Sequence, residues 1–397
     1  MTRGPRQWQR VEDQSPQLVP KVCEADRREP RRAPVLDRYS ENSGDRLSRR
    51  ALLAQGAAGA VALGAGALIA GSRVARAGAH GVQRPIERPL ARFAFVGCLV
   101  HSAEAEILDA VAASDPDLVL WQGDNIYSNT HDPVELAERY AILGHNPHFR
   151  RLRRRCPNLA VWDDHDYGKN DEGAEHPTKV DSQRIFLDFW KVPRDDPRWV
   201  QEGVYFCHEA GPPGQRVQLI FLDGRYHRSD KALGLRRAGT MLGEAQWRWL
   251  GEVLDRPADV RFILSGIQVV NTDYGKWERW NQFPHERGRL FREVRERRLP
   301  GVVILSGDMH QAEISKEDSA FGYPAWDITS CGLDQFETGE WPNSRRVGDV
   351  YNEPGGKFGV VDLDWGDEPA IRVAIHDYAG DVVLAQDLPL ASLTPPA

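Results

Sequence analysis

Residues 92–124, RFAFVGCLVHSAEAEILDAVAASDPDLVLWQGD, decide the fold of this chain. Residues 92–98 form a short apolar run that is typical of a buried strand, and residues 103–117 place apolar side chains on one face of a helix. A second apolar run follows at 118–124. A strand, a helix and a strand in this order predict a βαβ unit, whose two strands lie parallel in one sheet.

The alternation of strands and helices continues to residue 310. Further strands are predicted at 159–162, 203–210, 216–223, 260–270 and 301–310, and helices in the basic stretch up to 155 and at 180–190, 243–254 and 286–298. The last hundred residues differ, because short strands at 323–330, 357–365, 370–380 and 382–389 are separated by Gly, Pro and Asp. We interpret these strands as a second, more antiparallel sheet, and residues 90–397 as one domain.

The first 77 residues divide into a polar extension and a segment that has the composition of an export signal. Residues 1–47 are polar and rich in Pro and Arg, which favours a disordered extension or a misassigned start. Residues 48–77 contain a twin arginine, a Gly/Ala-rich apolar run and a small-x-small cleavage site. We therefore expect a twin-arginine signal, the twin-arginine translocase as a partner, and a periplasmic or extracellular protein without stable membrane insertion after cleavage. An uncleaved membrane anchor is the alternative.

Charge and cysteine content exclude several classes of protein. The chain carries a net charge of −7, and residues 78–397 carry 37 Lys and Arg against 50 Asp and Glu. This negative balance argues against a nucleic-acid partner, although a bound cation can still attract phosphate to a single cleft. The five cysteines have long, irregular spacings, which fit neither a disulfide scaffold nor a CxxC zinc site.

Residues 159–171, LAVWDDHDYGKND, indicate where the chemistry lies. The four carboxylates in this run surround one imidazole, and they stay ionised together only if positive charge lies among them. A metal ion is the obvious candidate. Polar residues of ligand type also follow other predicted strands: Cys98 and His101, Asp124 with Asn125 and Tyr127, Gln268, and Asp308 with His310. Because the carboxyl ends of parallel strands share one edge of a sheet, these side chains can converge.

The order of these residues resembles that of the calcineurin-like metallophosphoesterases, with several departures. Cys98 stands where the superfamily has its first Asp, DDHD replaces G-N-H-(D/E), Gln268 stands near the lone His, and GDMH replaces G-H-x-H. These departures resemble the PhoD-like alkaline phosphatase family, to whose diagnostic blocks GDNIY, WDDHDYGKND and LSGDMHQAE are similar. The resemblance covers most of residues 92–365. It implies an α/β fold, a four-layer α-β-β-α sandwich of two mixed sheets with a metal cluster at one edge.

The same resemblance implies that the cluster contains Fe³⁺ and Ca²⁺. Carboxylates, a tyrosine and a thiolate also suit hard cations better than zinc. By position we assign Asp124 as the bridging carboxylate, with Cys98, Tyr127 and Asp308 on the iron side. Asp164 and Asn170 are assigned to the second metal, Asp171 is a further candidate, and His310 can serve either ion. A small buried residue without a metal is the alternative for Cys98.

The predicted function is an exported metal-dependent phosphohydrolase, similar to alkaline phosphatase D, that cleaves phosphate monoesters and, as a second class, diesters. Bridging cations would polarise the phosphoryl oxygens and convert a bound water into a hydroxide nucleophile. His165 is the candidate general acid, and orienting Asp164 is its alternative role. Arg225 is the candidate clamp on phosphate, and a salt bridge with Asp223 is its alternative.

Two other functions are compatible with the sequence. The first is a dedicated phosphodiesterase that acts on glycerophosphodiester, teichoic or phospholipid head groups. The second is a non-catalytic phosphate- or metal-binding protein, which the replacement of superfamily histidines by Gln268 and Asp308 motivates.

Overall fold

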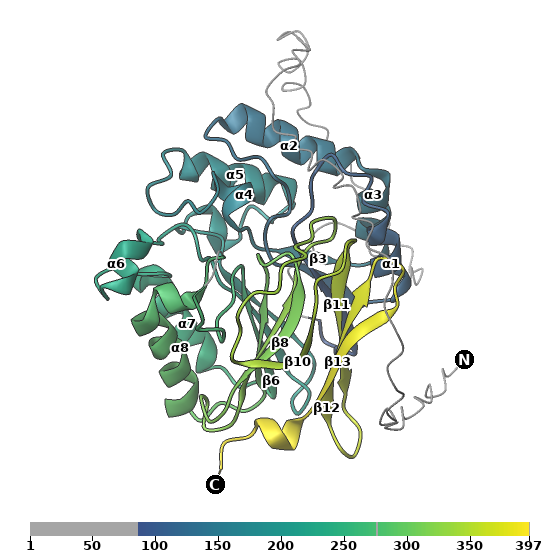
Figure 1. The fold of residues 1–397 in the computed structure, drawn as a ribbon, viewed down its shortest axis with the longest axis vertical. Coiled ribbons are helices and arrows are strands. Elements are labelled where there is room, and N and C mark those ends of the chain that lie inside the picture. Colours follow the sequence, from purple (N-terminus) through teal and green to yellow (C-terminus); the bar gives the residue numbers. More distant parts are fainter. Residues whose placement is uncertain (1–85, 275–276, 397) are drawn as a thin grey trace, which may run out of the picture. The chain divides into compact units, whose positions relative to one another are not determined.

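The computed structural model describes residues 86–274 and 277–396, all within one compact unit of the chain (Figure 1). The predicted extension 1–47 and signal segment 48–77 lie outside the described residues. Across the described stretches, every helix is too short or too polar to cross a bilayer.

Two mixed sheets form the centre of the structure. The first has the strand order β13-β12-β11-β1-β2-β3, and the second has the order β10-β8-β9-β7-β6-β5-β4. The strands of the first sheet are β1 (Arg92–Val96), β2 (Leu118–Trp121), β3 (Asn158–Ala160), β11 (Lys357–Asp364), β12 (Ala370–Asp377) and β13 (Val382–Pro389). Those of the second are β4 (Phe206–Ala210), β5 (Val217–Phe221), β6 (Val260–Ser265), β7 (Val302–Ser306), β8 (Ala312–Glu317), β9 (Ala325–Ser330) and β10 (Arg346–Tyr351).

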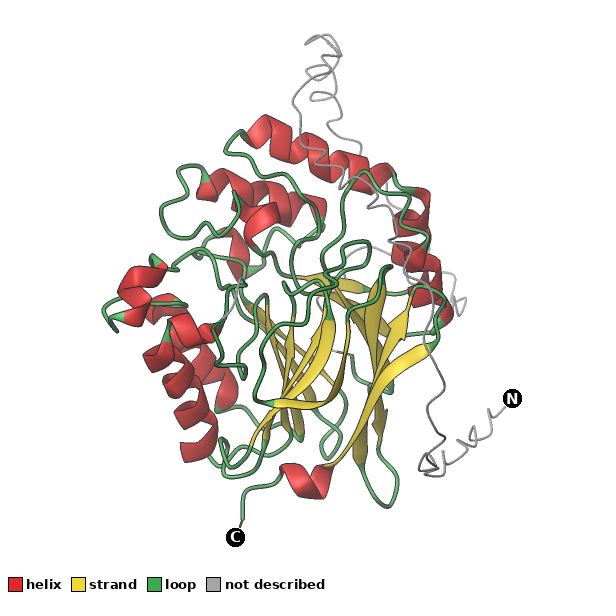
Figure 2. Cartoon of the chain, in the orientation of Figure 1, coloured by secondary structure: helices red, strands yellow, loops and turns green. Residues whose placement is uncertain are grey.

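Two groups of helices surround the strands: in Figures 1 and 2 one group runs across the top and down the right of the view, and the other lies at the left. One group is α1 (Ile107–Ala113), α2 (Pro133–His145), α3 (Pro147–Arg155), α4 (Asp164–Tyr167) and α5 (Lys179–Phe189). The other is α6 (Lys231–Leu235), α7 (Gly243–Leu254) and α8 (Pro284–Glu296), and short 3₁₀ helices occur at Pro197–Trp199, Trp280–Gln282 and Leu390–Leu393. Phe93 of β1 packs edge-on against Phe262 of β6, so the two sheets share one core. The predicted four-layer α-β-β-α sandwich is confirmed.

The prediction of a separate C-terminal sheet is wrong. β11 pairs antiparallel with β1, and the Arg92–Asp362 ion pair of 2.6 Å joins the two strands across 270 residues of sequence. β8 and β9 instead extend the second sheet beside β7. The periodicity of a strand specifies which of its faces is buried but does not specify the strand with which it pairs. The antiparallel strands that we predicted in one C-terminal sheet are therefore divided between the two sheets.

Glycines bring the two sheets into contact at the carboxyl ends of their central strands. A Cβ atom on Gly266, after β6, would lie 2.5 Å from the Asp163 carboxyl carbon, which follows β3 in the other sheet. The side-chain amide of Gln122 donates to the Ser306 carbonyl, 3.0 Å away, and so links the ends of β2 and β7. The polar strand ends of both sheets therefore meet in one place.

A disulfide joins the sheets at the same edge. Cys98 follows β1 in the first sheet, Cys331 follows β9 in the second, and their sulfurs are bonded across a separation of 233 residues. Both residues are 1% exposed. Closing so long a loop restricts the unfolded chain strongly, so this bond should contribute to stability.

Replacement of Cys331 by Ala should lower the free energy of unfolding by about 2–4 kcal/mol, because the covalent link between the sheets is lost. Chemical denaturation at fixed metal concentration measures the change. Cys156→Ala is the matched control, since Cys156 is buried and, among the described cysteines, is free of a disulfide. Equal destabilisation by the two substitutions would contradict a stabilising role for the bond.

Candidate metal centre

Four of the predicted ligands have an unusual backbone conformation. Cys98, Asp124, Asp308 and His310 have φ angles of 54°, 50°, 68° and 54°, in the left-handed region that favours glycine. Each residue lies just beyond the end of a strand, where the chain must turn sharply. Such conformations cost on the order of 1–3 kcal/mol each, and they concentrate at functional sites.

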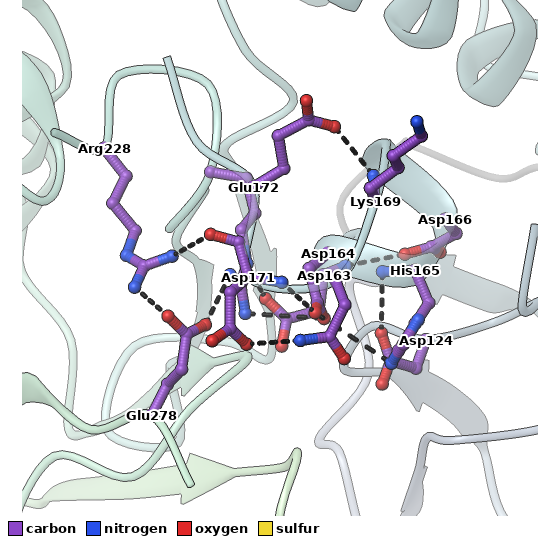
Figure 3. Close-up of polar contacts among 12 residues, drawn as sticks. Asp124, Asp163, Asp164, His165, Asp166, Lys169, Asp171, Glu172, Arg228 and Glu278 are labelled. Atoms are coloured by element: carbon purple, nitrogen blue, oxygen red, sulfur yellow. Dashed lines mark hydrogen bonds and ion pairs between the residues drawn. The ribbon is translucent and has the colours of Figure 1, made fainter. Parts of the chain in front are cut away.

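Buried carboxylates lie close together at this edge of the sheets, and Figure 3 shows Asp124, Asp163 and Asp164 among them. Asp124, Asp163, Asp164 and Asp308 are between 1% and 9% exposed. One oxygen each from Asp163, Asp164 and Asp308 lies within 4.8 Å of the others, and Asp124 forms a similar group with Asp164 and His165. Asp124 also forms a group with Cys98 and His310, and Asp164 belongs to both of the groups above, so either carboxylate is placed to bridge two cations.

Tyr127 and His310 lie on one side of Asp124. The Tyr127 hydroxyl is 3.3 Å from Asp124 Oδ2 and 2.7 Å from His310 Nε2. The buried ammonium group of Lys357 donates to the His310 carbonyl at 2.8 Å and so supports the strained turn. The structure thus brings Asp124, Tyr127 and His310 together as the sequence predicted, whereas Asp308 groups with Asp163 and Asp164.

The structure draws Cys98 into a disulfide, although its sulfur also forms a group of possible ligand atoms with Asp124 and His310, so metal binding stays a prediction for the reduced thiolate. Its sulfur lies 3.6 Å from Asp124 Oδ2 but is bonded to Cys331. A disulfide sulfur lacks the thiolate charge with which cysteine binds a cation. Cys98 therefore ties β1 to the second sheet.

The structure places Asn170 at the surface, at the tip of the loop after α4. Its amide donates to Asp171 Oδ1 at 2.9 Å, and the Asp171 backbone N–H donates to Asp164 Oδ2 at 2.8 Å. Asp171 also forms a group with Asp164 and Glu278. Asp171, our further candidate, is thus connected directly to the buried carboxylates, and Asn170 is connected through it.

Asp163 and Glu278 belong to the site but were not assigned from the sequence. Asp163 lies within residues 159–171, beside Asp164, and the acidic composition of this run is a signal for it. Glu278 is 4% exposed and lies beyond Gln268 in the irregular segment between β6 and α8, at a position that belongs to none of the predicted strand ends. It forms ion pairs with Arg225 at 2.6 Å and with Arg228 (Figure 3).

Arg225 is buried among carboxylates. It pairs with Asp163 through Nε and with Glu278 through Nη1, and Nη2 lies 3.5 Å from Asp164 Oδ1. The alternative of a salt bridge with Asp223 is wrong, because Asp223 accepts the Arg225 backbone N–H instead. Arg225 therefore positions the acidic residues. Its contact with phosphate, which would be made through Nη2, stays a prediction.

His165 lies at the edge of the carboxylates. Its Nδ1 is 2.6 Å from Asn129 Oδ1, and its Nε2 is 3.9 Å from Asp164 Oδ2. Burial lowers the pKa of His165, against the opposing effect of Asp164, so the neutral ring is favoured. A neutral imidazole with Nδ1–H directed at Asn129 presents an acceptor at Nε2. The role of His165 as general acid stays a prediction, because protonation of its neutral ring requires an additional negative charge nearby.

The electrostatics of the site suit a cation. Burial, reinforced by neighbouring carboxylates, raises the pKa values of Asp124 and Asp308 well above the usual range. Burial also raises the pKa of Asp163 to about 7, although Arg225 opposes this. Within the described residues, Asp163 Oδ2, Asp164 Oδ1 and Asp308 Oδ2 are buried without a hydrogen-bond partner. Oxygens of this kind fit the hard cations that the resemblance implies.

Metal binding should release protons. Because the metal-free pKa of Asp163 is about 7, this carboxyl is mostly protonated at pH 6 and mostly ionised at pH 8. A cation binds only the ionised form, so deprotonation of Asp163 alone should make the affinity for Ca²⁺ about tenfold higher at pH 8 than at pH 6, and displacement of protons from Asp124 or Asp308 should steepen this dependence. Calorimetric titration of chelated protein in buffers of different ionisation enthalpy measures both quantities. A pH-independent affinity without proton release would contradict this electrostatic account.

Comparisons with known proteins agree with this geometry. Residues 93–336 match the profile of the PhoD-like phosphatases. Alkaline phosphatase D of Bacillus subtilis (strain 168) is 23% identical over 277 residues, which cover 56% of this chain and 46% of that protein. The chain thus spans less than half the length of this curated relative.

Two solved structures share the fold. A structure of PhoD superposes with a TM-score of 0.59 at 16% identity and covers 76% of this chain and 73% of its own. GAP50, described as the anchor in the inner membrane complex of Plasmodium, superposes with a TM-score of 0.50 at 15% identity, over 76% of this chain and 90% of its own. Because the profile matches more than half of the sequence, the chain belongs to the PhoD-like phosphatase family.

Proposed function

We propose that this protein is an exported, metal-dependent phosphohydrolase that cleaves phosphate monoesters, with diesters as a second substrate class. The observation that carries the proposal is the set of buried carboxylate oxygens that face one another without hydrogen-bond partners among the described residues. Membership of the PhoD-like phosphatases supports the reaction class. The fold alone does not decide it, since GAP50 shares the fold and is described as an anchor.

The proposed metals are Fe³⁺ and Ca²⁺. Asp124 and Asp164 would be shared between them, with Tyr127 and His310 on one side and Asp163 and Asp308 on the other. When bound, such cations polarise phosphoryl oxygens, supply a nucleophile near neutral pH and offset the charge that accumulates in the transition state.

The protein's own side chains orient the reacting groups. Arg225 and Arg228 hold Glu278 and Asp163 in place, so the acidic cluster is preorganised before substrate arrives. His165 is held by Asn129, with Nε2 turned toward Asp164. A phosphate dianion bound beside His165 would raise its pKa, and the ring could then donate a proton to the leaving oxygen.

Replacement of Asp124 by Asn should reduce turnover by at least about 10²-fold, because the shared carboxylate would lose its charge. Hydrolysis of p-nitrophenyl phosphate and bis-p-nitrophenyl phosphate, with Ca²⁺ present, measures the loss. Asp195→Asn is the control, since Asp195 lies at the surface. A higher rate on the diester would favour the dedicated phosphodiesterase, and bound metal without turnover on either ester would establish the binding protein instead.

Export is tested by a separate substitution. The pair Arg49→Lys and Arg50→Lys should leave active precursor in the cytoplasm, because the translocase recognises the twin arginine. Fractionation followed by immunoblotting measures the distribution, and Arg46→Lys is the control outside the pair. Normal export of the double variant would contradict a twin-arginine route and would leave the hydrolase proposal unaffected.

A further inference from the structure

A second group of ligand-type side chains lies outside the candidate metal centre. This His–Glu–His cluster consists of His131, before α2, Glu172, after α4, and His176, before α5. His131 Nε2 is 2.6 Å from Glu172 Oε1, and His176 Nδ1 is 3.3 Å from Glu172 Oε2. One donor atom from each residue lies within 4.8 Å of the other two, and the imidazole rings are 5.1 Å apart.

The strongest sign of a ligand is the unused nitrogen of His176. Its side chain is fully buried, and Nδ1 lacks a hydrogen-bond partner among the described residues despite its proximity to Glu172. The other ring nitrogen, Nε2, is 2.9 Å from the buried Ser182 hydroxyl. A metal-binding histidine usually forms a hydrogen bond to a nearby oxygen through one ring nitrogen and directs the other at the metal, and the Ser182 hydroxyl can be that oxygen.

The surroundings hold the cluster in place. Thr178 donates to the His131 carbonyl at 2.8 Å, and the Lys169 backbone N–H donates to Glu172 Oε2 at 2.7 Å (Figure 3). A Cβ atom on Gly168 would lie 2.3 Å from Glu172 Oε2 and 3.1 Å from His176 Nδ1. The absence of a side chain at Gly168 thus lets the Glu172 carboxylate lie close to the backbone and beside His176, and the His131 side chain, 34% exposed, provides an entry path from solvent.

We propose that the His–Glu–His cluster binds a divalent first-row transition metal ion, with Zn²⁺ as the best match. Two imidazole nitrogens and one carboxylate form a ligand set that suits zinc, with a fourth position for water. The same set is poor for calcium, which takes six to eight oxygen ligands. The site therefore differs in chemistry from the oxygen-rich centre nearby.

The bound ion would fix the loop that follows α4. Glu172 directly follows Asp171, and in Figure 3 its side chain extends away from Asp163 and Asp164. Asp171 instead contacts Asp164 through its backbone N–H. An ion that joins Glu172 to α2 and α5 would therefore hold the backbone of Asp171 and Asn170 in position. The binding proposal does not depend on the proposed hydrolase function, because its readout is metal content.

The test is zinc binding by the full-length protein. Chelated protein is saturated with Ca²⁺ and titrated with Zn²⁺, and elemental analysis after desalting gives the zinc retained. The wild type should retain about one zinc per chain, and Co²⁺ in its place should give the visible absorption of a four-coordinate site. His131→Ala should abolish both signals, and Ser182→Ala should weaken zinc binding by about 10–100-fold.

Two variants serve as controls. His145→Ala removes an exposed histidine of α2 and should retain the zinc. Asp124→Asn changes the oxygen-rich centre and should also retain it. His131 is partly exposed, so its replacement should not prevent folding, unlike replacement of the buried His176. Absence of zinc from the wild type, equal zinc in His131→Ala and wild type, or zinc loss in Asp124→Asn alone would overturn the proposal.

Discussion

The rest of the structure depends on an excess of negative charge that is buried at one edge of the two sheets. Asp124, Asp163, Asp164, Asp308 and Glu278 lie at one edge of the two sheets, and Arg225 and Arg228 face them. Two guanidinium groups cannot neutralise five carboxylates. An ionised carboxylate without a partner is so costly to bury that it either takes up a proton or binds a cation.

The fold supplies the geometry that concentrates this charge. Short strands from both sheets end at the same edge, and glycines such as Gly266 let the backbone of one sheet approach the carboxylates of the other. The Cys98–Cys331 bond fixes the two sheets there. Left-handed turns at Asp124 and Asp308 then direct their side chains inward. The strain in these turns is offset by the structure around them.

Much of this arrangement could be predicted from the sequence, because the strand and helix periods are local signals. The run 159–171 and the residues after each apolar strand indicated the acidic cluster correctly. Contacts between residues that lie far apart in the sequence could not be predicted from these local signals. β11 pairs with β1, and Cys98 finds Cys331, through contacts that no spacing encodes. Glu278 was not found because it enters the site from an irregular segment.

The most direct test of this account is elemental analysis of protein purified at pH 8 without added metal. Buried carboxylates in excess of their cationic partners predict about two tightly bound ions in the acidic centre, iron and calcium, both lost in Asp164→Ala. Zinc held by the His–Glu–His cluster would remain in that variant. A folded wild-type chain whose acidic centre contains no metal at this pH would contradict the account, because the buried carboxylates would then be kept neutral by protonation and not by a cation.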